Sequence, residues 1–229
     1  LLTHEIPKTF GVFSGSIRAG SDESFRELLE GFVRLYADSL GNERWGEQVK
    51  VKGDNSIELS MLFHGLTEAE AREVWKPFLA NLESRPQEFK VEINVIIMPA
   101  REMWNYTYMA DKHSELLTRD ERKGQPKGQY WWASNQAEVS RYIYSYQSRW
   151  VPQDLFKPAR AKRLAELFFQ MSRNHTFSLH FNKGQAGASA EAVERGRMTS
   201  INPAGFDASA QILMNDGERD ASPDIAGHA

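Results

Sequence analysis

The stretch FKVEINVII, residues 89–97, is the clearest strand in the sequence. Successive side chains of a strand point to opposite faces of a sheet, so its strict alternation predicts one apolar and one polar face. The apolar face consists of Phe89, Val91, Ile93, Val95 and Ile97. The polar face consists of Lys90, Glu92 and Asn94. Pro99 follows and is expected to end the strand.

The residues before this strand predict the rest of one folding unit. Residues 10–18 indicate a strand, and a helix capped by Ser21 should run up to Gly41. Residues 48–52 and 57–63 indicate a hairpin, and Thr67 and Glu70 form a capping box that begins a second helix. The resulting order, strand–helix–strand–strand–helix–strand, is that of the ferredoxin-like βαββαβ unit. The sequence therefore predicts an α+β fold with a large antiparallel sheet and helices on one face.

The second half of the chain is harder to interpret. Residues 99–158 are irregular and aromatic, residues 159–171 form an amphipathic helix, and residues 176–181 alternate as a further strand. Ser189 should cap another helix, and Asn202–Pro203 introduces a helical stretch to about residue 215. We expect one domain over residues 1–229, with linkers at residues 1–9 and 217–229.

Composition excludes several classes of function. The chain has 229 residues, 41% of them hydrophobic and 26% charged, and a net charge of −3. Such a charge gives no reason to expect nucleic acid or an anionic membrane as a partner. No apolar run is long enough to span a bilayer. The absence of cysteine excludes disulfides, zinc–thiolate sites, iron–sulfur clusters and cysteine nucleophiles, but it leaves the compartment undetermined.

The sequence contains no motif for binding a nucleotide phosphate or a metal. Gly11, Gly15 and Gly20 do not have the spacing of a dinucleotide-binding loop, and residues 124–128 lack the Lys-Ser/Thr ending of a P-loop. The histidines do not form a helical metal-binding pair, and there is no nucleophile elbow. We therefore expect no metal site and no cofactor-binding residues in this chain.

The polar face of the predicted sheet has two interpretations. It carries Ser60 on one strand, Glu92 and Asn94 on another, and His180 and Asn182 on the late strand. An antiparallel sheet can leave such a face in water. Its Glu, Asn, Ser and His residues also suit hydrogen bonding to a ligand, so both interpretations remain open.

An aromatic segment over residues 130–150 also has two interpretations. Its rings could belong to a core, or they could line a pocket for a flat or sugar-like ligand, because Ser, Asn, Gln and Arg are interspersed among them. On the second interpretation, Tyr144 and Arg149 are candidate substrate contacts.

Several segments resemble a known family, and they occur in the same order as in that family. They are THEIPKTFG (3–11), WGE (45–47), SMLFHGL (60–66), YWW (130–132), LHFNKGQAGA (179–188) and NPA (202–204). The sequence is similar to the substrate-binding domain of bacterial FAD-linked oxidoreductases of the vanillyl-alcohol-oxidase and berberine-bridge-enzyme-like (PCMH-type) superfamily. The resemblance implies that the polar sheet face looks onto the flavin and substrate, and that a separate domain, absent from this chain, holds the FAD.

These observations lead to a functional hypothesis with open alternatives. The parent enzyme is expected to oxidise an alcohol or amine by hydride transfer to flavin, whereas this fragment alone should not be catalytically competent. Glu92 and His180 are the candidate bases, and the candidate substrate contacts are Ser60, Asn94, Tyr144, Arg149 and Asn182. The alternatives are a stand-alone ferredoxin-like ligand-binding module and a hydrolase or lyase that uses Glu92 and His180 alone. The expected partners are a small-molecule substrate, the parent's own FAD-binding domain and, through exposed surfaces, a second copy in a homodimer.

Overall fold

The computed structural model describes residues 5–120, 123–126, 128–133, 141–182 and 186–220. They cluster into two compact units. The larger unit comprises residues 9–97 and 147–214, and the smaller one comprises the described residues within 1–8, 98–146 and 215–229.

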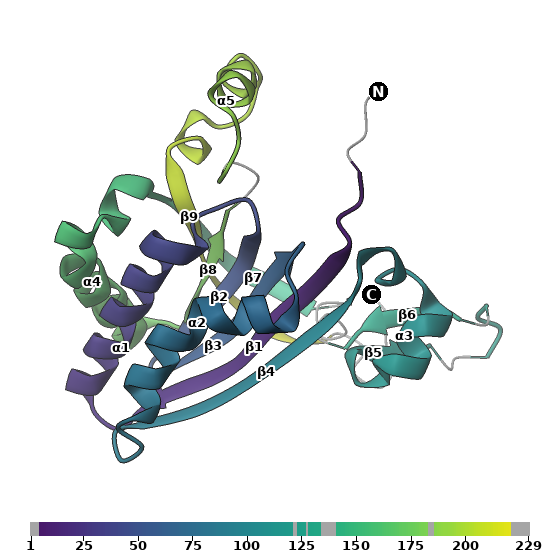
Figure 1. Ribbon diagram of the computed structural model, residues 1–229, viewed down its shortest axis with the longest axis horizontal. Coiled ribbons are helices and arrows are strands. Elements are labelled where there is room, and N and C mark those ends of the chain that lie inside the picture. Colours follow the sequence, from purple (N-terminus) through teal and green to yellow (C-terminus); the bar gives the residue numbers. More distant parts are fainter. Residues whose placement is uncertain (1–4, 121–122, 127, 134–140, 183–185, 221–229) are drawn as a thin grey trace. The chain divides into compact units, whose positions relative to one another are not determined.

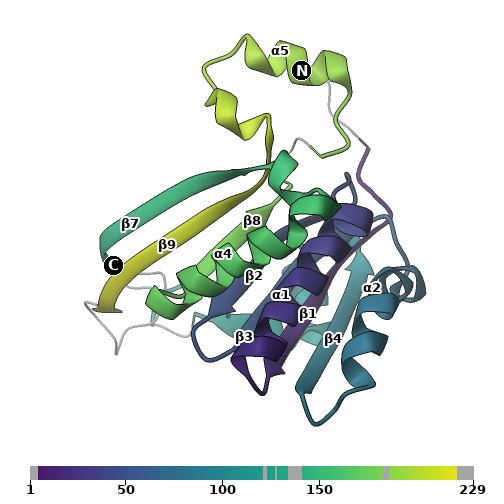
Figure 2. The same cartoon turned by 90° about the vertical axis from the view of Figure 1, so that its left-hand side faces the viewer.

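A seven-stranded antiparallel sheet is the framework of the larger unit (Figures 1 and 2). Its order is β4-β1-β3-β2-β8-β9-β7. The strands are β1 (Thr9–Ala19), β2 (Trp45–Lys52), β3 (Ser56–His64), β4 (Phe89–Pro99), β7 (Arg141–Pro152), β8 (Phe177–Phe181) and β9 (Ala208–Asp220). The first four, in the order β4-β1-β3-β2, are the sheet of the predicted ferredoxin-like unit, so the predicted α+β class is confirmed.

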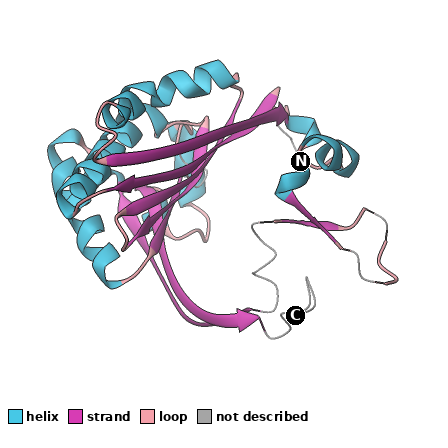
Figure 3. Ribbon diagram, turned by 90° about the horizontal axis from the view of Figure 1, so that it is seen from below, coloured by secondary structure: helices cyan, strands magenta, loops and turns pink. Residues whose placement is uncertain are grey.

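Helices cover one face of this sheet (Figure 3). They are α1 (Asp22–Leu35), α2 (Glu68–Glu83) and α4 (Ala161–Asn174), and α1 packs beside α4. The predicted caps are present, since the Ser21 side chain accepts from the amide of Ser24, and Thr67 and Glu70 form the complete capping box. A π-helical turn, Tyr36–Leu40, follows α1 directly and extends the helical stretch to Gly41.

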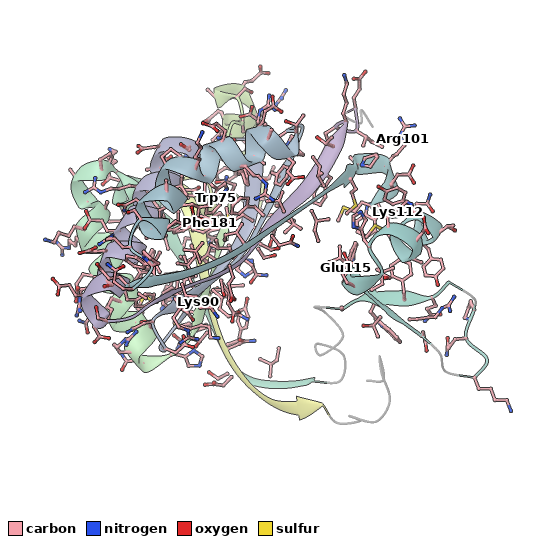
Figure 4. The ribbon with its side chains drawn as sticks, turned by 60° about the horizontal axis from the view of Figure 1, so that its bottom comes forward. Trp75, Lys90, Arg101, Lys112, Glu115 and Phe181 are labelled. Atoms are coloured by element: carbon pink, nitrogen blue, oxygen red, sulfur yellow. The ribbon has the colours of Figure 1, made fainter. Side chains whose placement is uncertain are left out.

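Aromatic side chains fill the space between the sheet and the helices. Phe13 of β1 stacks on Trp75 of α2, with ring centroids 4.4 Å apart and planes 8° apart. Phe181 of β8 meets Phe32 edge to face at 5.7 Å. Figure 4 shows Trp75 and Phe181 inside this layer. These contacts fix which face of each strand is buried, and therefore which face is left open.

One predicted helix is a strand in the structure. Residues 202–215 were expected to be helical, but only a 3-10 turn, Pro203–Gly205, precedes β9. Buried Ala210 and Ile212 alternate with the partly exposed Gln211, and the strand pairs with β8. A period of two is therefore present in the sequence, but small residues weaken it. Residues 141–152, expected to be irregular, form β7.

The remaining helix of the larger unit, α5 (Ala190–Arg197), is capped by Ser189 as predicted. The smaller unit contains α3 (Tyr106–Lys112) and a hairpin of β5 (Leu117–Arg119) and β6 (Tyr130–Trp132). Tyr106 stacks on Tyr130 with ring centroids 5.0 Å apart. Tyr130, at the start of the aromatic segment, therefore packs against α3.

Candidate functional site

The sheet face that the helices leave uncovered, here called the open face, carries side chains in rows across the strands. The register aligns Ser14 with Ser60, Gln48, His180 and Gln211 on successive strands. At one end of this row, the Ser14 hydroxyl lies 3.5 Å from the carbonyl oxygen of Asn94. The polar row is therefore defined as Asn94, Ser14, Ser60, Gln48, His180 and Gln211.

A charged row lies beside the polar row. It consists of Glu92, Ser16, Glu58, Lys50 and Ser178. Glu58 forms ion pairs with Lys52 at 2.8 Å and with Lys50 at 3.5 Å. The hydrogen bond from Lys52 is the main reason why the pKa of Glu58 is lowered. These mutual pairings suit a solvated sheet surface more than a reaction site.

An apolar row lies on the other side of the polar row, where Val12, Leu62 and Gly46 are aligned and half-buried. A hollow of about 180 Å³ adjoins it, and Phe10, Glu47 and His64 contribute to its wall. The His64 ring is anchored, since its Nε2 lies 2.8 Å from the carbonyl oxygen of Glu43. The open face thus passes from charged to polar to apolar along the strands.

The two candidate bases share the open face but not one site. Four strand spacings of about 4.8 Å separate β4, which carries Glu92, from β8, which carries His180, or roughly 19 Å in all. The two residues also belong to different rows. A single small reacting group therefore cannot touch both of them.

Glu92 is an exposed carboxylate in an ion pair. Its oxygen lies 2.7 Å from the ammonium of Lys90. The hydrogen bond from Lys90 is the main reason why the pKa of Glu92 is lowered, and its charge and Ser16 act in the same direction. A general base near neutral pH needs a raised carboxylate pKa, so these surroundings work against that role.

His180 has a more sheltered setting in the middle of the polar row. Only 17% of its side chain is exposed, and its Nδ1 lies 3.5 Å from a carboxylate oxygen of Glu47. Gln48 and Gln211 are its neighbours on the adjoining strands. An imidazole paired with a carboxylate and flanked by amides can remove a proton and hold a polar ligand.

Several members of the polar row have unused hydrogen-bonding capacity. Among the described residues, the side chains of Ser60, Gln48, Gln211 and Asn94 form no hydrogen bond. Ser60 and both glutamines are half-buried, while Asn94 is exposed. Partly desolvated amides and hydroxyls without partners are suited to bind a ligand that carries hydroxyl or amino groups.

Asn182 was predicted to lie on the polar face as a substrate contact. In the structure its side chain binds backbone groups and stabilises the fold. Its φ of +49° takes it out of the alternation of β8. Its Nδ2 donates to the carbonyls of Leu40, Asn42 and Trp45 at 2.8, 3.2 and 2.7 Å, and its Oδ1 accepts from the hydroxyl of Tyr36. These contacts engage both the nitrogen and the oxygen of the amide inside the fold, which is a structural role and not that of a substrate contact.

The last two candidates lie on β7. The side chain of Tyr144 lies outside the described residues. Arg149 is exposed, but it shares its strand face with buried Val151, two residues later, so strand parity assigns it to the helix side and not to the open face. Its contact with a substrate therefore remains a prediction that the polar row does not support.

Sequence reasoning missed three residues beside His180. Gln48 shares one face with Lys50 and Lys52 in a strand that was predicted, so its face could have been identified. Gln211 was missed because its segment was assigned to a helix. Glu47 could not have been found by alternation, because its φ of +68° breaks the period of the strand.

The described residues contain no group of three or more potential metal ligands from histidine, aspartate and glutamate. Within this part of the chain, no helix combines the length and apolar character that a membrane span requires.

Comparisons with known proteins show similarity through the fold. No protein-family model and no curated protein matches the sequence. A VAO-type flavoprotein of Myceliophthora thermophila matches 95% of this chain and 34% of its own, with a TM-score of 0.59 and 16% identity. A BBE-like protein of Physcomitrella patens matches 94% of this chain and 40% of its own, with a TM-score of 0.55 and 10% identity.

The chain has the fold of a segment of VAO-type flavoproteins. A carbohydrate oxidase of Microdochium nivale, solved with a substrate analogue, also matches 95% of this chain and 40% of its own, with a TM-score of 0.50 and 15% identity. The chain thus spans about a third to two-fifths of the length of these VAO-type and related structures. At such identities the likeness concerns the fold, and at that level it confirms the resemblance seen in the sequence.

Replacing Asn182 tests its structural role. Asn182→Ala leaves three carbonyls and one hydroxyl without their partner, so we expect it to lower the free energy of unfolding by about 2–4 kcal/mol. Asn182→Gly removes the same bonds but tolerates positive φ, and it should be less harmful by about 1 kcal/mol. Urea denaturation of the chain measures both. A cost below about 0.5 kcal/mol for either variant would contradict this role.

Tyr36 gives a test in alkaline solution. Burial raises the pKa of its phenol from the ordinary value of 10.0 to about 12, although the hydrogen bond to Ser209 opposes this. The folded chain therefore keeps the proton longer than the unfolded chain, and the free energy of unfolding should fall as pH rises from about 10 to about 12. Tyr36→Phe should remove up to about 2–3 kcal/mol of this fall. Urea denaturation of both proteins at several pH values in this range measures the free energy of unfolding. If that free energy falls equally steeply with pH in the wild type and in Tyr36→Phe, the prediction is wrong.

Proposed function

We propose that this chain is the substrate-binding part of a longer flavin-dependent oxidoreductase. The observation that carries the proposal is the polar row, in which half-buried amides and a hydroxyl with unused hydrogen-bonding capacity flank the Glu47–His180 pair. The VAO-type fold supports it, because solved proteins that share this fold are flavoproteins and oxidases.

The residues of this chain suit the substrate side of a flavin site more than the binding of the cofactor itself. The sequence has no glycine-rich loop for the phosphates of FAD. The apolar row at Val12, Leu62 and Gly46 offers a surface on which a flat ring can lie, with the polar row beside it. A part of the longer protein outside this chain would hold the FAD, whose bound flavin would accept a hydride from the substrate carbon.

The polar row would bind and orient the substrate. Amides at Gln48, Gln211 and Asn94 and the hydroxyl of Ser60 can donate to and accept from several hydroxyl groups. The substrate class that fits best is therefore an alcohol with more than one hydroxyl, with an amine as the second choice. The carbohydrate oxidase among the structural neighbours supports this preference.

His180 would act as the base. It takes the proton from the substrate hydroxyl, while the hydrogen on the adjoining carbon leaves with the bonding electron pair as the hydride. The carbon–oxygen bond becomes a carbonyl, and the proton stays on the imidazole until solvent accepts it. We assign Glu92 to the ion pairs of the charged row and not to this step.

The complete reading frame that encodes this chain provides the first test. Its product should carry one flavin per polypeptide, seen as absorbance near 450 nm, while the 229-residue chain purified alone should carry none. Stoichiometric flavin on the short chain would overturn the division of roles between the two parts. Absence of flavin from the complete product would overturn the proposed function and favour a stand-alone ligand-binding module.

The second test concerns the base. In the flavin-containing protein, anaerobic mixing with a panel of aldoses, simple alcohols and primary amines should bleach the flavin with at least one compound. With that compound, His180→Asn should slow flavin reduction by at least about 100-fold in stopped-flow absorbance. Glu92→Gln, a matched change on the same sheet face, should stay within about twofold of wild type.

Two results would contradict this second prediction. Wild-type reduction rates in His180→Asn would remove His180 from the reaction. Failure of every compound on the panel to bleach a bound flavin would overturn the proposed substrate class.

A further inference from the structure

Glu47 has an unusual backbone conformation for its place in the sheet. It lies inside β2, yet its φ is +68°, in the left-handed region that disfavours residues with a Cβ atom. Only two other described non-glycine residues, Asn55 and Asn182, have positive φ. Asparagine tolerates this region better than glutamate does. If only the backbone conformation mattered, glycine or asparagine would suit this position better than glutamate.

The positive φ changes where the carboxylate lies. The register pairs Glu47 with Met61 on one side and Phe181 on the other, and both partners are buried in the core. In a regular strand Glu47 would share their face, where an unpaired carboxylate is strongly disfavoured. Instead, 36% of its side chain is exposed, and its oxygen lies 3.5 Å from Nδ1 of His180. The strained backbone therefore brings the carboxylate to the open face.

Contact at Nδ1 has a chemical consequence for the imidazole. A carboxylate accepts hydrogen bonds but cannot donate them, so a neutral His180 in contact with it carries its proton on Nδ1. The other ring nitrogen, Nε2, is then the atom with the free lone pair. Backbone strain of this kind is frequent where a side chain must be held in one functional position.

We propose that Glu47 is a positioning residue that holds His180 in the Nδ1–H tautomer and so leaves Nε2 free to accept a proton from the ligand on the polar row. This inference rests on the proposed function in one respect only, namely that the proton accepted by Nε2 comes from the bound ligand. The 3.5 Å separation is long for a hydrogen bond, and such contacts often shorten only when a substrate is bound.

The tautomer can be measured directly on the 229-residue chain. Long-range proton–nitrogen NMR of protein labelled with ¹⁵N-histidine distinguishes the two ring nitrogens, and His180→Asn assigns the signals by their loss. Spectra are recorded on the high-pH plateau of the His180 shifts, where the ring is neutral. We expect wild-type His180 as the Nδ1–H form.

Two substitutions at Glu47 and one control test the cause. Glu47→Ala and Glu47→Gln should shift most of the population toward the Nε2–H form. Glu58→Gln removes the same charge from the same sheet face without contact to His180, and it should leave the tautomer as in wild type. An Nε2–H form in wild type, an unchanged tautomer in both Glu47 variants, or an equal shift in Glu58→Gln would overturn the proposal.

If one Glu47 variant does not fold, the tautomer of wild-type His180 still tests the proposal, because an Nε2–H form there would overturn it. It also separates this inference from the proposed function, because the spectra require no flavin. An Nδ1–H tautomer together with a complete protein that lacks flavin would overturn only the proposed function. In a flavin-containing protein, Glu47→Gln should slow flavin reduction at least tenfold, and a wild-type rate would overturn only the role of Glu47.

Discussion

The burial of one sheet face beneath α1, α2 and α4 is the constraint on which the rest of this structure depends. Phe13, Trp75 and Phe181 occupy the layer between sheet and helices, so a slip of one residue in any strand would expose part of it. With that register fixed, the opposite side chains have fixed places as well. The polar row lies on the open face because the residues that alternate with its members are buried in the aromatic layer on the other face.

Alternation and capping made most of this arrangement predictable. The four strands of the ferredoxin-like unit and its two helices follow from periods of two and 3.6 and from Ser21, Thr67 and Glu70. Alternation did not indicate β9, where small residues obscure the period, or β7, where each of the two alternate sets of residues mixes polar with apolar types. Gln211 was missed because β9 was predicted to be a helix, so its place on the polar row was missed as well.

One residue of the site, Glu47, and one residue that supports the fold, Asn182, depend on backbone geometry that no local pattern indicates. Asn182 and Glu47 both adopt positive φ, and each therefore lies on the side of the sheet opposite to the one its spacing predicts. Asn182 turns toward the helices and binds three carbonyls, while Glu47 turns away from the core toward His180. His180 was found from the sequence because β8 is regular through Phe181. The partner of His180 could be found only in three dimensions.

The separation of charged and polar rows has a consequence for the effect of ionic strength. Mobile ions screen interactions between exposed charges, but they act weakly on hydrogen bonds between neutral groups. The row at Gln48, Ser60 and Gln211 consists of neutral amides and a hydroxyl, whereas Lys50, Lys52 and Glu58 lie in and beside the charged row. A neutral ligand held by the first group would keep its affinity in concentrated salt, even where the second group loses part of its mutual attraction.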